Sequence, residues 1–280
     1  MEKWPLGVFA SIDAGLGVKL EVARELGVPT LHLHAPTAQN RTEQAAQDFL
    51  QKLDGYGMRV TAVFGGFEGE SYADIPTVVK TVGLTPEDTR ASRLAEMKEI
   101  SDFARHLGVP VVALHLGFIS EDRESASYKS VVETTQDLCD YCANNNQSLH
   151  LETGQETAEG LLHFLGDVAR DNLFVNFDPA NMILYGTAEP IPALEQVGKF
   201  VRSVHCKDGR WSQNPGKDWG EEVSLGEGDV DFAAFLTTLK KIGYTGPLTI
   251  EREIPQEPER QRAEIGSAVS LLERLKREIG

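Results

Sequence analysis

The chain has 280 residues, 41% of them hydrophobic, and a formal net charge of −16, which suits one large α/β domain and repels polyanions such as nucleic acid. Its three cysteines, an odd number, indicate a reducing compartment rather than a disulfide framework. Residues 1–13 lack the pattern of a signal peptide, and no stretch approaches the ~18 apolar residues of a membrane span, so we expect a cytoplasmic protein without a membrane partner.

Short apolar strands alternate with amphipathic helical stretches along the chain. In chain order, the expected elements are strand 6–12, helix 18–26, strand 30–34, helix 43–56, strand 59–64, helix 86–107, strand 110–116, helix 125–143, strand 149–152, helix 158–170, strand 173–177, helix 191–200, strand 201–206, helix 231–242, strand 247–250 and helix 258–279. Long loops separate 64 from 86 and 206 from 231. Thr85 is expected to cap the helix that begins at Pro86, and Thr157 is expected to cap the helix at 158–170.

Eight strand–helix units in one chain predict a single (β/α)8 TIM barrel, of class α/β, spanning residues 1–280 as one domain. A doubly wound open sheet is the alternative. It is less favoured because no Gly-x-Gly-x-x-Gly motif follows the first strand.

Four chemically active side chains stand at the ends of four consecutive predicted strands: Glu152, Asp178, His205 and Glu251. The carboxyl ends of barrel strands form the reactive face, and neighbouring strands lie only ~4.8 Å apart, so these side chains are expected to converge. Singly, each carboxylate would be read as a helix cap or a surface ion pair. Together without a cation they would repel one another, which predicts one divalent metal ion.

The predicted ligand set of three carboxylates and one imidazole, without thiolate, suits Mn²⁺, Mg²⁺ or Co²⁺, with Zn²⁺ as an alternative. Strand alternation places Lys207 on the same inward face as His205, whereas Cys206 points outward to the helices. The second ring nitrogen of His205 is expected to contact a carbonyl or carboxylate that fixes its tautomer.

Further polar residues on the reactive side are candidates for substrate binding. His34 and His115 end two other strands and would bind substrate hydroxyls, or, structurally, a neighbouring carbonyl. Glu156 would reach the pocket or cap the next helix, and Lys207 would bind a substrate oxygen or pair with an acidic neighbour. His32, one layer deeper than His34, is expected to serve packing.

Five segments of this sequence resemble the sugar phosphate isomerase/epimerase family, the xylose isomerase-like TIM-barrel group that includes ketose 3-epimerases, inosose dehydratases and related lyases. They are Leu-Glu-Thr-Gly-Gln-Glu at 151–156, Asn-Phe-Asp-Pro-Ala-Asn at 176–181, Val-His-Cys-Lys-Asp at 204–208, Gly-Glu-Gly-Asp-Val-Asp at 226–231 and Ile-Glu at 250–251. They occur in the family's order and cover nearly the whole chain.

The resemblance implies that Glu152, Asp178, His205 and Glu251 bind one divalent ion and that the two glutamates also act as acid and base. Asn181 stands where the epimerases usually carry a substrate-binding histidine, and Arg210 matches a substrate-binding arginine.

We therefore expect a metal-dependent isomerase or epimerase that moves a proton next to the carbonyl of a sugar or polyol, through an enediolate. A lyase or dehydratase acting on a keto-sugar, an inosose or a 3-keto-glycoside is the alternative, which Asn181 favours. The expected partner is a small sugar or polyol and not nucleic acid. The sequence leaves homo-oligomerisation open.

Overall fold

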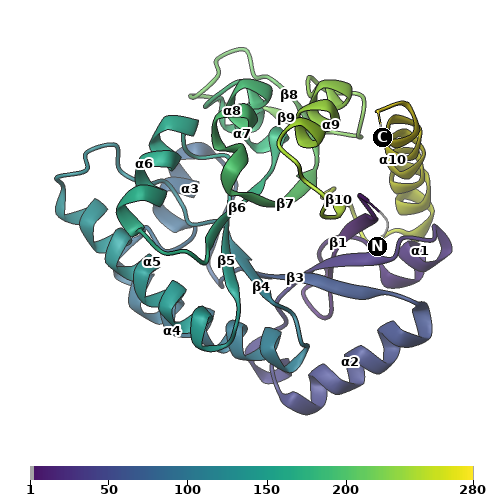
Figure 1. Cartoon of the computed structure of the whole chain (residues 1–280), viewed down its shortest axis with the longest axis horizontal. Coiled ribbons are helices and arrows are strands. Elements are labelled where there is room, and N and C mark those ends of the chain that lie inside the picture. Colours follow the sequence, from purple (N-terminus) through teal and green to yellow (C-terminus); the bar gives the residue numbers. More distant parts are fainter. Residues whose placement is uncertain (1–2, 280) are drawn as a thin grey trace.

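The computed structural model describes residues 3–279 and shows a closed barrel of eight parallel strands surrounded by helices (Figure 1). The barrel strands are β1 (Leu6–Ser11), β2 (Thr30–His34), β3 (Arg59–Gly65), β4 (Val111–Leu114), β5 (Ser148–Glu152), β6 (Leu173–Phe177), β7 (Val201–Cys206) and β10 (Leu248–Ile250). Each strand pairs with its neighbour in sequence order, and the first strand pairs with the last, β1 with β10. The predicted TIM barrel is confirmed.

The helices lie on the outside of the barrel (Figure 1). They are α1 (Leu20–Glu25), α2 (Glu43–Tyr56), α3 (Ile75–Thr81), α4 (Glu87–His106), α5 (Ala126–Asn144), α6 (Ala158–Val168), α7 (Pro179–Tyr185), α8 (Pro190–Val197), α9 (Phe232–Lys241) and α10 (Pro258–Ile279), with short 3-10 turns at Ala38–Asn40 and Gly198–Phe200. The hydroxyl of Thr157 accepts a hydrogen bond from Gly160 N at 3.1 Å, which confirms the predicted cap of α6.

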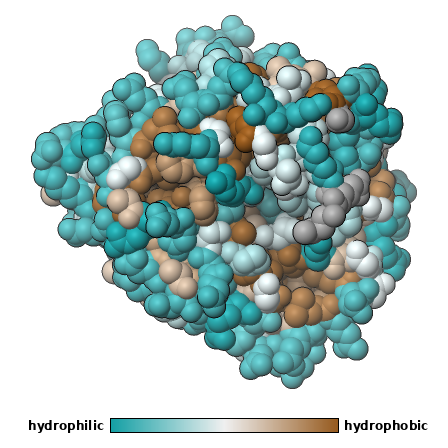
Figure 2. Space-filling model, in the orientation of Figure 1, coloured by the Kyte–Doolittle hydropathy of each residue, from teal (hydrophilic) through white to brown (hydrophobic). Residues whose placement is uncertain are grey.

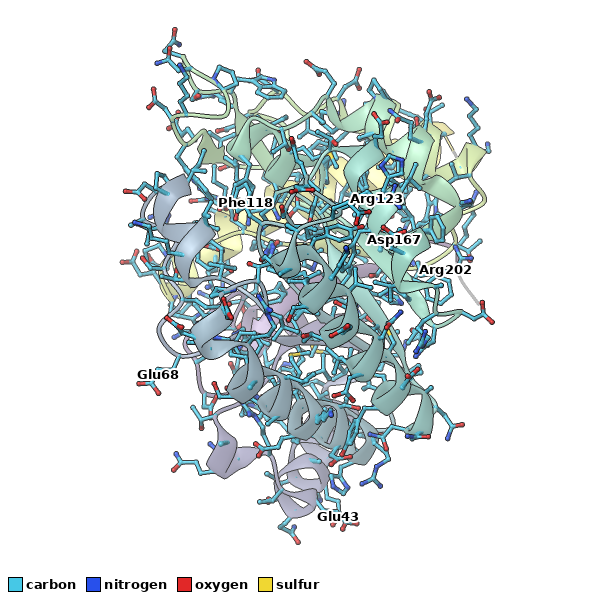
Figure 3. All side chains as sticks on the ribbon, turned by 90° about the vertical axis from the view of Figure 1, so that its left-hand side faces the viewer. Glu43, Glu68, Phe118, Arg123, Asp167 and Arg202 are labelled. Atoms are coloured by element: carbon cyan, nitrogen blue, oxygen red, sulfur yellow. The ribbon has the colours of Figure 1, made fainter. Side chains whose placement is uncertain are left out.

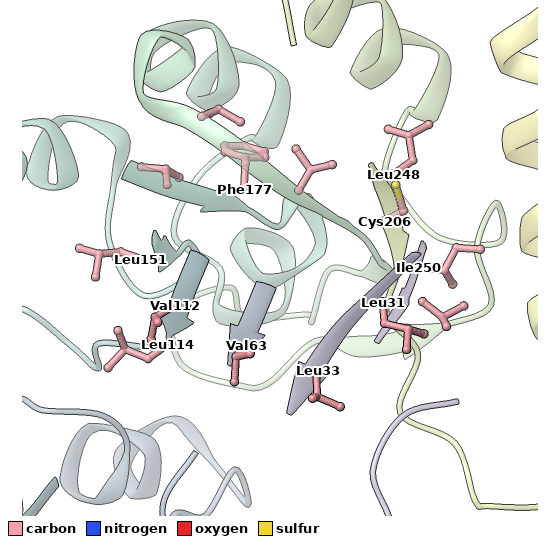
Figure 4. Close-up of a cluster of buried hydrophobic side chains, with 14 of the residues drawn as sticks. Leu31, Leu33, Val63, Val112, Leu114, Leu151, Phe177, Cys206, Leu248 and Ile250 are labelled. Atoms are coloured by element: carbon pink, nitrogen blue, oxygen red, sulfur yellow. The ribbon is translucent and has the colours of Figure 1, made fainter. Parts of the chain in front are cut away.

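Strand alternation divides the interior into two layers. Residues that point outward form the large hydrophobic core between the strands and the helices, seen in Figure 4, where Cys206 lies with Leu248 and Ile250. Cys206 is fully buried there, as predicted. Inward-pointing residues are mostly polar and line the barrel axis, which places titratable groups where little water reaches them.

The loops contain elements that local sequence patterns did not predict: α3, α7 and a two-stranded antiparallel sheet of β8 (Asp208–Arg210) and β9 (Glu221–Val223). The predicted role of Thr85 was wrong, because Pro86 is the N-cap of α4 and no side chain caps it. The carbonyl of Thr85 instead accepts a hydrogen bond from the buried Arg90 at 2.6 Å.

Asp208 holds the long loop that follows β7. Its buried carboxylate accepts hydrogen bonds from four backbone N–H groups, those of Gly209, Gly226, Gly228 and Val230, at 2.8–3.2 Å. A Cβ at Gly228 would lie 2.2 Å from Asp208 Oδ1, so this position requires glycine. The Gly-Glu-Gly segment therefore wraps around a carboxylate next to the strand ends.

The molecular surface is largely hydrophilic around the periphery of the face in Figure 2. Ion pairs tie outer elements together: Figure 3 shows Arg123 beside Asp167, where the guanidinium and carboxylate approach to 2.6 Å. No helix within residues 3–279 has both the length and the apolar composition that a membrane crossing requires.

Candidate metal centre

The four predicted residues converge at the carboxyl ends of the barrel strands. Each of Glu152, Asp178, His205 and Glu251 offers a donor atom within 4.8 Å of the others, and all four side chains are buried. Their convergence follows from the pairing of β5, β6, β7 and β10 side by side. The sequence-based ligand set is thus brought together as one cluster.

The spacing within the cluster fits a cation. His205 Nδ1 lies 2.6 Å from Glu152 Oε1 and 2.9 Å from Glu251 Oε2, and a single ring N–H satisfies only one of these carboxylates. Asp178 Oδ2 and Glu251 Oε2 are buried without a hydrogen bond. Three buried carboxylate groups, two of which have an oxygen without a hydrogen bond, surround one imidazole nitrogen and could hold one divalent metal ion.

The charge balance of the cluster points the same way. Burial raises the pKa of Asp178 well above its usual value, because the charged form is desolvated. Burial alone would lower the pKa of His205, but the carboxylates of Glu251 and Glu152 outweigh it and raise that pKa to about 10. Without a metal ion, the negative charges of the cluster are therefore balanced only by protons on its side chains. A divalent cation at the same place would replace these protons.

The second ring nitrogen of His205 contacts another histidine rather than the expected carbonyl or carboxylate. His205 Nε2 lies 3.0 Å from His32 Nδ1. If Nδ1 of His205 binds a cation, the ring proton is on Nε2, and this N–H group donates a hydrogen bond to His32. His32 is buried and its pKa is well below the usual value because of desolvation, so it is neutral and able to accept. The packing role predicted for His32 was incomplete.

Two aromatic rings pack against the imidazole of His205. The rings of Phe64 and His205 stack with centroids 4.9 Å apart, and the ring of Phe9 meets His205 edge-on at 5.8 Å. These rings keep water from the buried face of the imidazole, which strengthens its electrostatic interactions.

Glu152 has a second partner, His115. Gln155 Nε2 donates to His115 Nδ1 at 3.2 Å, which leaves the His115 proton on Nε2, 3.0 Å from Glu152 Oε2. One oxygen of Glu152 thus belongs to the cluster and the other is held by a histidine that lines the cavity.

A cavity of about 990 Å³ opens above the cluster. Of the residues predicted to bind substrate, His34, His115, Asn181 and Lys207 line this cavity. Lys207 Nζ is buried 3.6 Å from Glu251 Oε2 and 3.8 Å from Glu253 Oε1.

Two of the predicted substrate-binding residues lie elsewhere. Glu156 and Arg210 are not among the described residues that line the cavity. Glu156 is buried, and desolvation raises its pKa to about 8. Arg210 is exposed and donates to the carbonyl of Glu227 at 2.8 Å.

The chain belongs to the xylose isomerase-like TIM barrel family, whose model matches residues 20–275. Among solved structures, a xylose isomerase domain protein from Planctomyces limnophilus is 58% identical over 99% of both chains, with a TM-score of 0.96. A xylose isomerase-like TIM barrel protein from Mycobacterium smegmatis in complex with magnesium is 17% identical over 95% of this chain and 97% of its own, with a TM-score of 0.69, a likeness of fold alone.

Two curated proteins match over part of the chain. An uncharacterized protein of Methanocaldococcus jannaschii is 28% identical over 56% of this chain and 55% of its own length. L-ribulose 3-epimerase of Methylomonas sp. strain DH-1 is 30% identical over 43% of this chain and 40% of its own length. The matched segments therefore span about half the length of these relatives.

Proposed function

We propose that this protein is a divalent-metal-dependent isomerase or epimerase of a sugar or polyol, with Glu152 and Glu251 as acid and base. The observation that carries the proposal is the buried cluster of these two glutamates with Asp178 and His205 at the mouth of a large cavity. The partial likeness to an L-ribulose 3-epimerase supports it.

A bound Mn²⁺, Mg²⁺ or Co²⁺ supplies Lewis-acid polarisation of a substrate carbonyl and stabilises the negative charge that develops on its oxygen. Glu152, Asp178, Glu251 and Nδ1 of His205 would hold it. The two buried carboxylate oxygens that lack a hydrogen bond, Asp178 Oδ2 and Glu251 Oε2, favour this assignment.

The protein groups move the proton. Glu152 on β5 and Glu251 after β10 are separated by β6 and β7, so their carboxylates approach the cavity from opposite sides of the cluster. One carboxylate takes the proton from the carbon next to the carbonyl as the C–H bond breaks, and the electron pair moves into the enediolate. The other returns a proton to the opposite face, which inverts the carbon. Return to the neighbouring carbon gives aldose–ketose isomerisation instead.

Neighbouring side chains position Glu152 and Glu251 and influence their charge. His115 donates to the free oxygen of Glu152, and Lys207 lies beside Glu251. Burial alone would raise the pKa of Glu251, but the charges of Lys207 and His205 outweigh it and hold that pKa well below the usual value. In the metal-free cluster Glu251 is therefore ionised at neutral pH. When a cation takes the place of the His205 proton, Lys207 remains beside Glu251 and still favours its charged form.

A lyase or dehydratase is the second candidate, favoured by Asn181. Its amide lines the cavity, and Nδ2 is buried without a hydrogen bond, whereas the epimerases that this chain resembles carry histidine there. In this reaction the same enediolate forms, and a β-hydroxyl or glycosidic oxygen leaves with its bonding electrons.

Incubation of the Mg²⁺-loaded protein with free ketoses, inososes and keto-glycosides in D₂O, followed by NMR, tests both candidates. Deuterium entering an intact carbon skeleton identifies an isomerase or epimerase, and loss of water or aglycone identifies a lyase. Glu152→Gln and Glu251→Gln should each lower kcat by about 10²–10⁴-fold, because each removes a group that carries the proton. Near-wild-type turnover by both variants would disprove the assignment.

A further inference from the structure

The cavity extends well beyond the metal centre. It reaches from Glu152 and Glu251 at the strand ends, past His34 and Gly66, to the outer surface of α4. Its volume of about 990 Å³ stands at the top of the ~300–1,000 Å³ that holds drug-sized ligands. A single sugar ring at the metal centre would leave much of this space to a further part of the ligand.

The remote part of the cavity, here called the α4 arm, is formed by Arg41, Ser92, Ala95, Glu96 and Glu99. Arg41 is fixed in the arm with its side chain only 7% exposed: Nε donates to the carbonyl of Pro36 and Nη2 to Glu96 Oε1, both at 2.7 Å. Its third nitrogen, Nη1, is buried without a hydrogen bond and lies 3.7 Å from Glu99 Oε2. A buried donor without a partner calls for a ligand or water.

The charges of the cavity define what fits there. Glutamates line it throughout, and its arginine and lysine, Arg41 and Lys207, are each within 4.0 Å of glutamate oxygens. Among the described residues that line the arm, the one cation, Arg41, already faces Glu96 and Glu99, so a phosphate or carboxylate there would be repelled. Hydroxyl groups match this lining, because each both donates to a carboxylate and accepts from a guanidinium.

We infer that the α4 arm is a second sugar subsite and that the substrate is a neutral glycoside or disaccharide. The reacting ring lies at the metal centre, and the attached ring lies in the arm against Arg41, Glu96 and Glu99. The inference rests on the proposed function for the reacting ring and extends it to the substrate class.

The test is a steric block of the arm. Ala95→Trp fills it from an exposed position of α4, whereas Ala91→Trp adds the same bulk one turn earlier, at an exposed position that is not among the described lining residues. The probes are the keto-disaccharides lactulose, turanose and isomaltulose, the free ketoses D-fructose and D-tagatose, and fructose 6-phosphate. Deuterium incorporation in D₂O gives kcat/KM, and saturation-transfer NMR on metal-free protein reports binding.

Wild-type protein should prefer at least one disaccharide over the free ketoses by about tenfold or more, and reject the phosphate. Ala95→Trp should lower that ratio by about tenfold or more and abolish the saturation transfer to the outer ring, while Ala91→Trp preserves both. Failure of every disaccharide to bind, or a ratio unchanged by Ala95→Trp, would overturn the subsite even if free ketoses are turned over. Arm-dependent binding without turnover of any probe would instead support the subsite and refute the proposed reaction.

Discussion

The Nδ1 atom of His32 accepts a hydrogen bond from the Nε2–H group of His205. This contact fixes the orientation of the His205 ring, so that Nδ1 is the nitrogen that faces the cluster. Such orienting contacts typically change metal affinity by about 10–100-fold. We expect His32→Ala to weaken Mn²⁺ binding by about that factor and His32→Gln, which retains an acceptor, to restore part of it, as measured by calorimetric titration.

The control for this experiment is His150→Ala. His150 is also a buried imidazole on the barrel axis, but it bonds Ser203 and Ser148 and not a ligand of the cluster. It should lower stability while leaving the Mn²⁺ affinity unchanged. Equal losses of affinity in the two alanine variants would show that His32 acts only through general packing.

Glu156 makes stability depend on pH. Desolvation raises its pKa to about 8 in the folded protein, so unfolding releases a proton between its ordinary pKa of 4.5 and about 8. The stability that the protonated form contributes is complete below 4.5 and is lost as pH rises to about 8. Glu156→Gln should therefore raise the free energy of unfolding at pH 8 by about 4 kcal/mol relative to wild type, with little difference at pH 4.5, in denaturant titrations. A pH-independent difference would contradict this origin.

Among the elements, the loop after β7 depends on the absence of a side chain at Gly228. A methyl group there would press on Asp208 Oδ1 and on the carbonyl of Gly209, at 2.2 and 2.6 Å, and disturb the four hydrogen bonds that Asp208 accepts. We expect Gly228→Ala to lower the free energy of unfolding by about 2–4 kcal/mol, measured by thermal and chemical denaturation.

Gly166→Ala is the matched control. Gly166 lies in α6, is exposed, and would place its methyl group more than 4 Å from any other group. It should stabilise the protein by about 0.5–1 kcal/mol, because alanine loses less backbone entropy in a helix. Similar destabilisation by both substitutions would rule out the contact with Asp208 as the cause.

The barrel strands were predictable because each carries alternating outward apolar residues between recognisable helix ends, a purely local signal. The missed α7 had a local signal too: Asp178 caps it, with Oδ1 accepting from Ala180 N and Asn181 N, and Pro179 occupies its first turn. A cap and a metal ligand are alternatives for Asp178 in the sequence, whereas in the structure Oδ1 caps α7 and Oδ2 faces the cluster. The β8–β9 sheet had no local signal, since its two three-residue strands are joined by a ten-residue loop.

Only the part of the site that stands at the ends of the barrel strands was predictable from the sequence. The cluster follows from which residues terminate β5, β6, β7 and β10, but the contact between His32 and His205 joins β2 to β7 across the barrel and depends on register. The α4 arm likewise joins Arg41, in the loop after β2, to Glu96 of α4, 55 residues later, which no periodic pattern encodes.

For the molecule as a whole, the cluster couples stability to the metal. An ion that binds the folded state alone adds about 2.7 kcal/mol at a concentration 100 times its Kd. We expect Mn²⁺ or Mg²⁺ to raise the Tm of metal-stripped protein by about 5 °C or more, and EDTA to reverse the shift, in calorimetric scans.

Asp178→Asn keeps the oxygen that caps α7 but removes the charge, so it should lose most of the metal-dependent shift and retain the fold. A full shift in this variant would exclude Asp178 as a ligand. The same scans with Cys206→Ala, whose side chain lies in the outer core, should show a lower Tm but an undiminished response to metal.

The pairing of β1 with β10 has a consequence for the order of events during biosynthesis. Glu251 follows the strand that closes the ring, and Trp4 Nε1 bonds the carbonyl of Tyr244 across 240 residues of chain at 2.8 Å. A growing chain emerges N-terminus first, so seven barrel strands precede the one that delivers the last ligand. We therefore expect the metal ion to bind only after the barrel has closed. Ribosome-stalled chains that end before β10 should bind Mn²⁺ far more weakly than chains stalled after α10 has emerged. Equal binding would show that a partly assembled barrel acquires the ion.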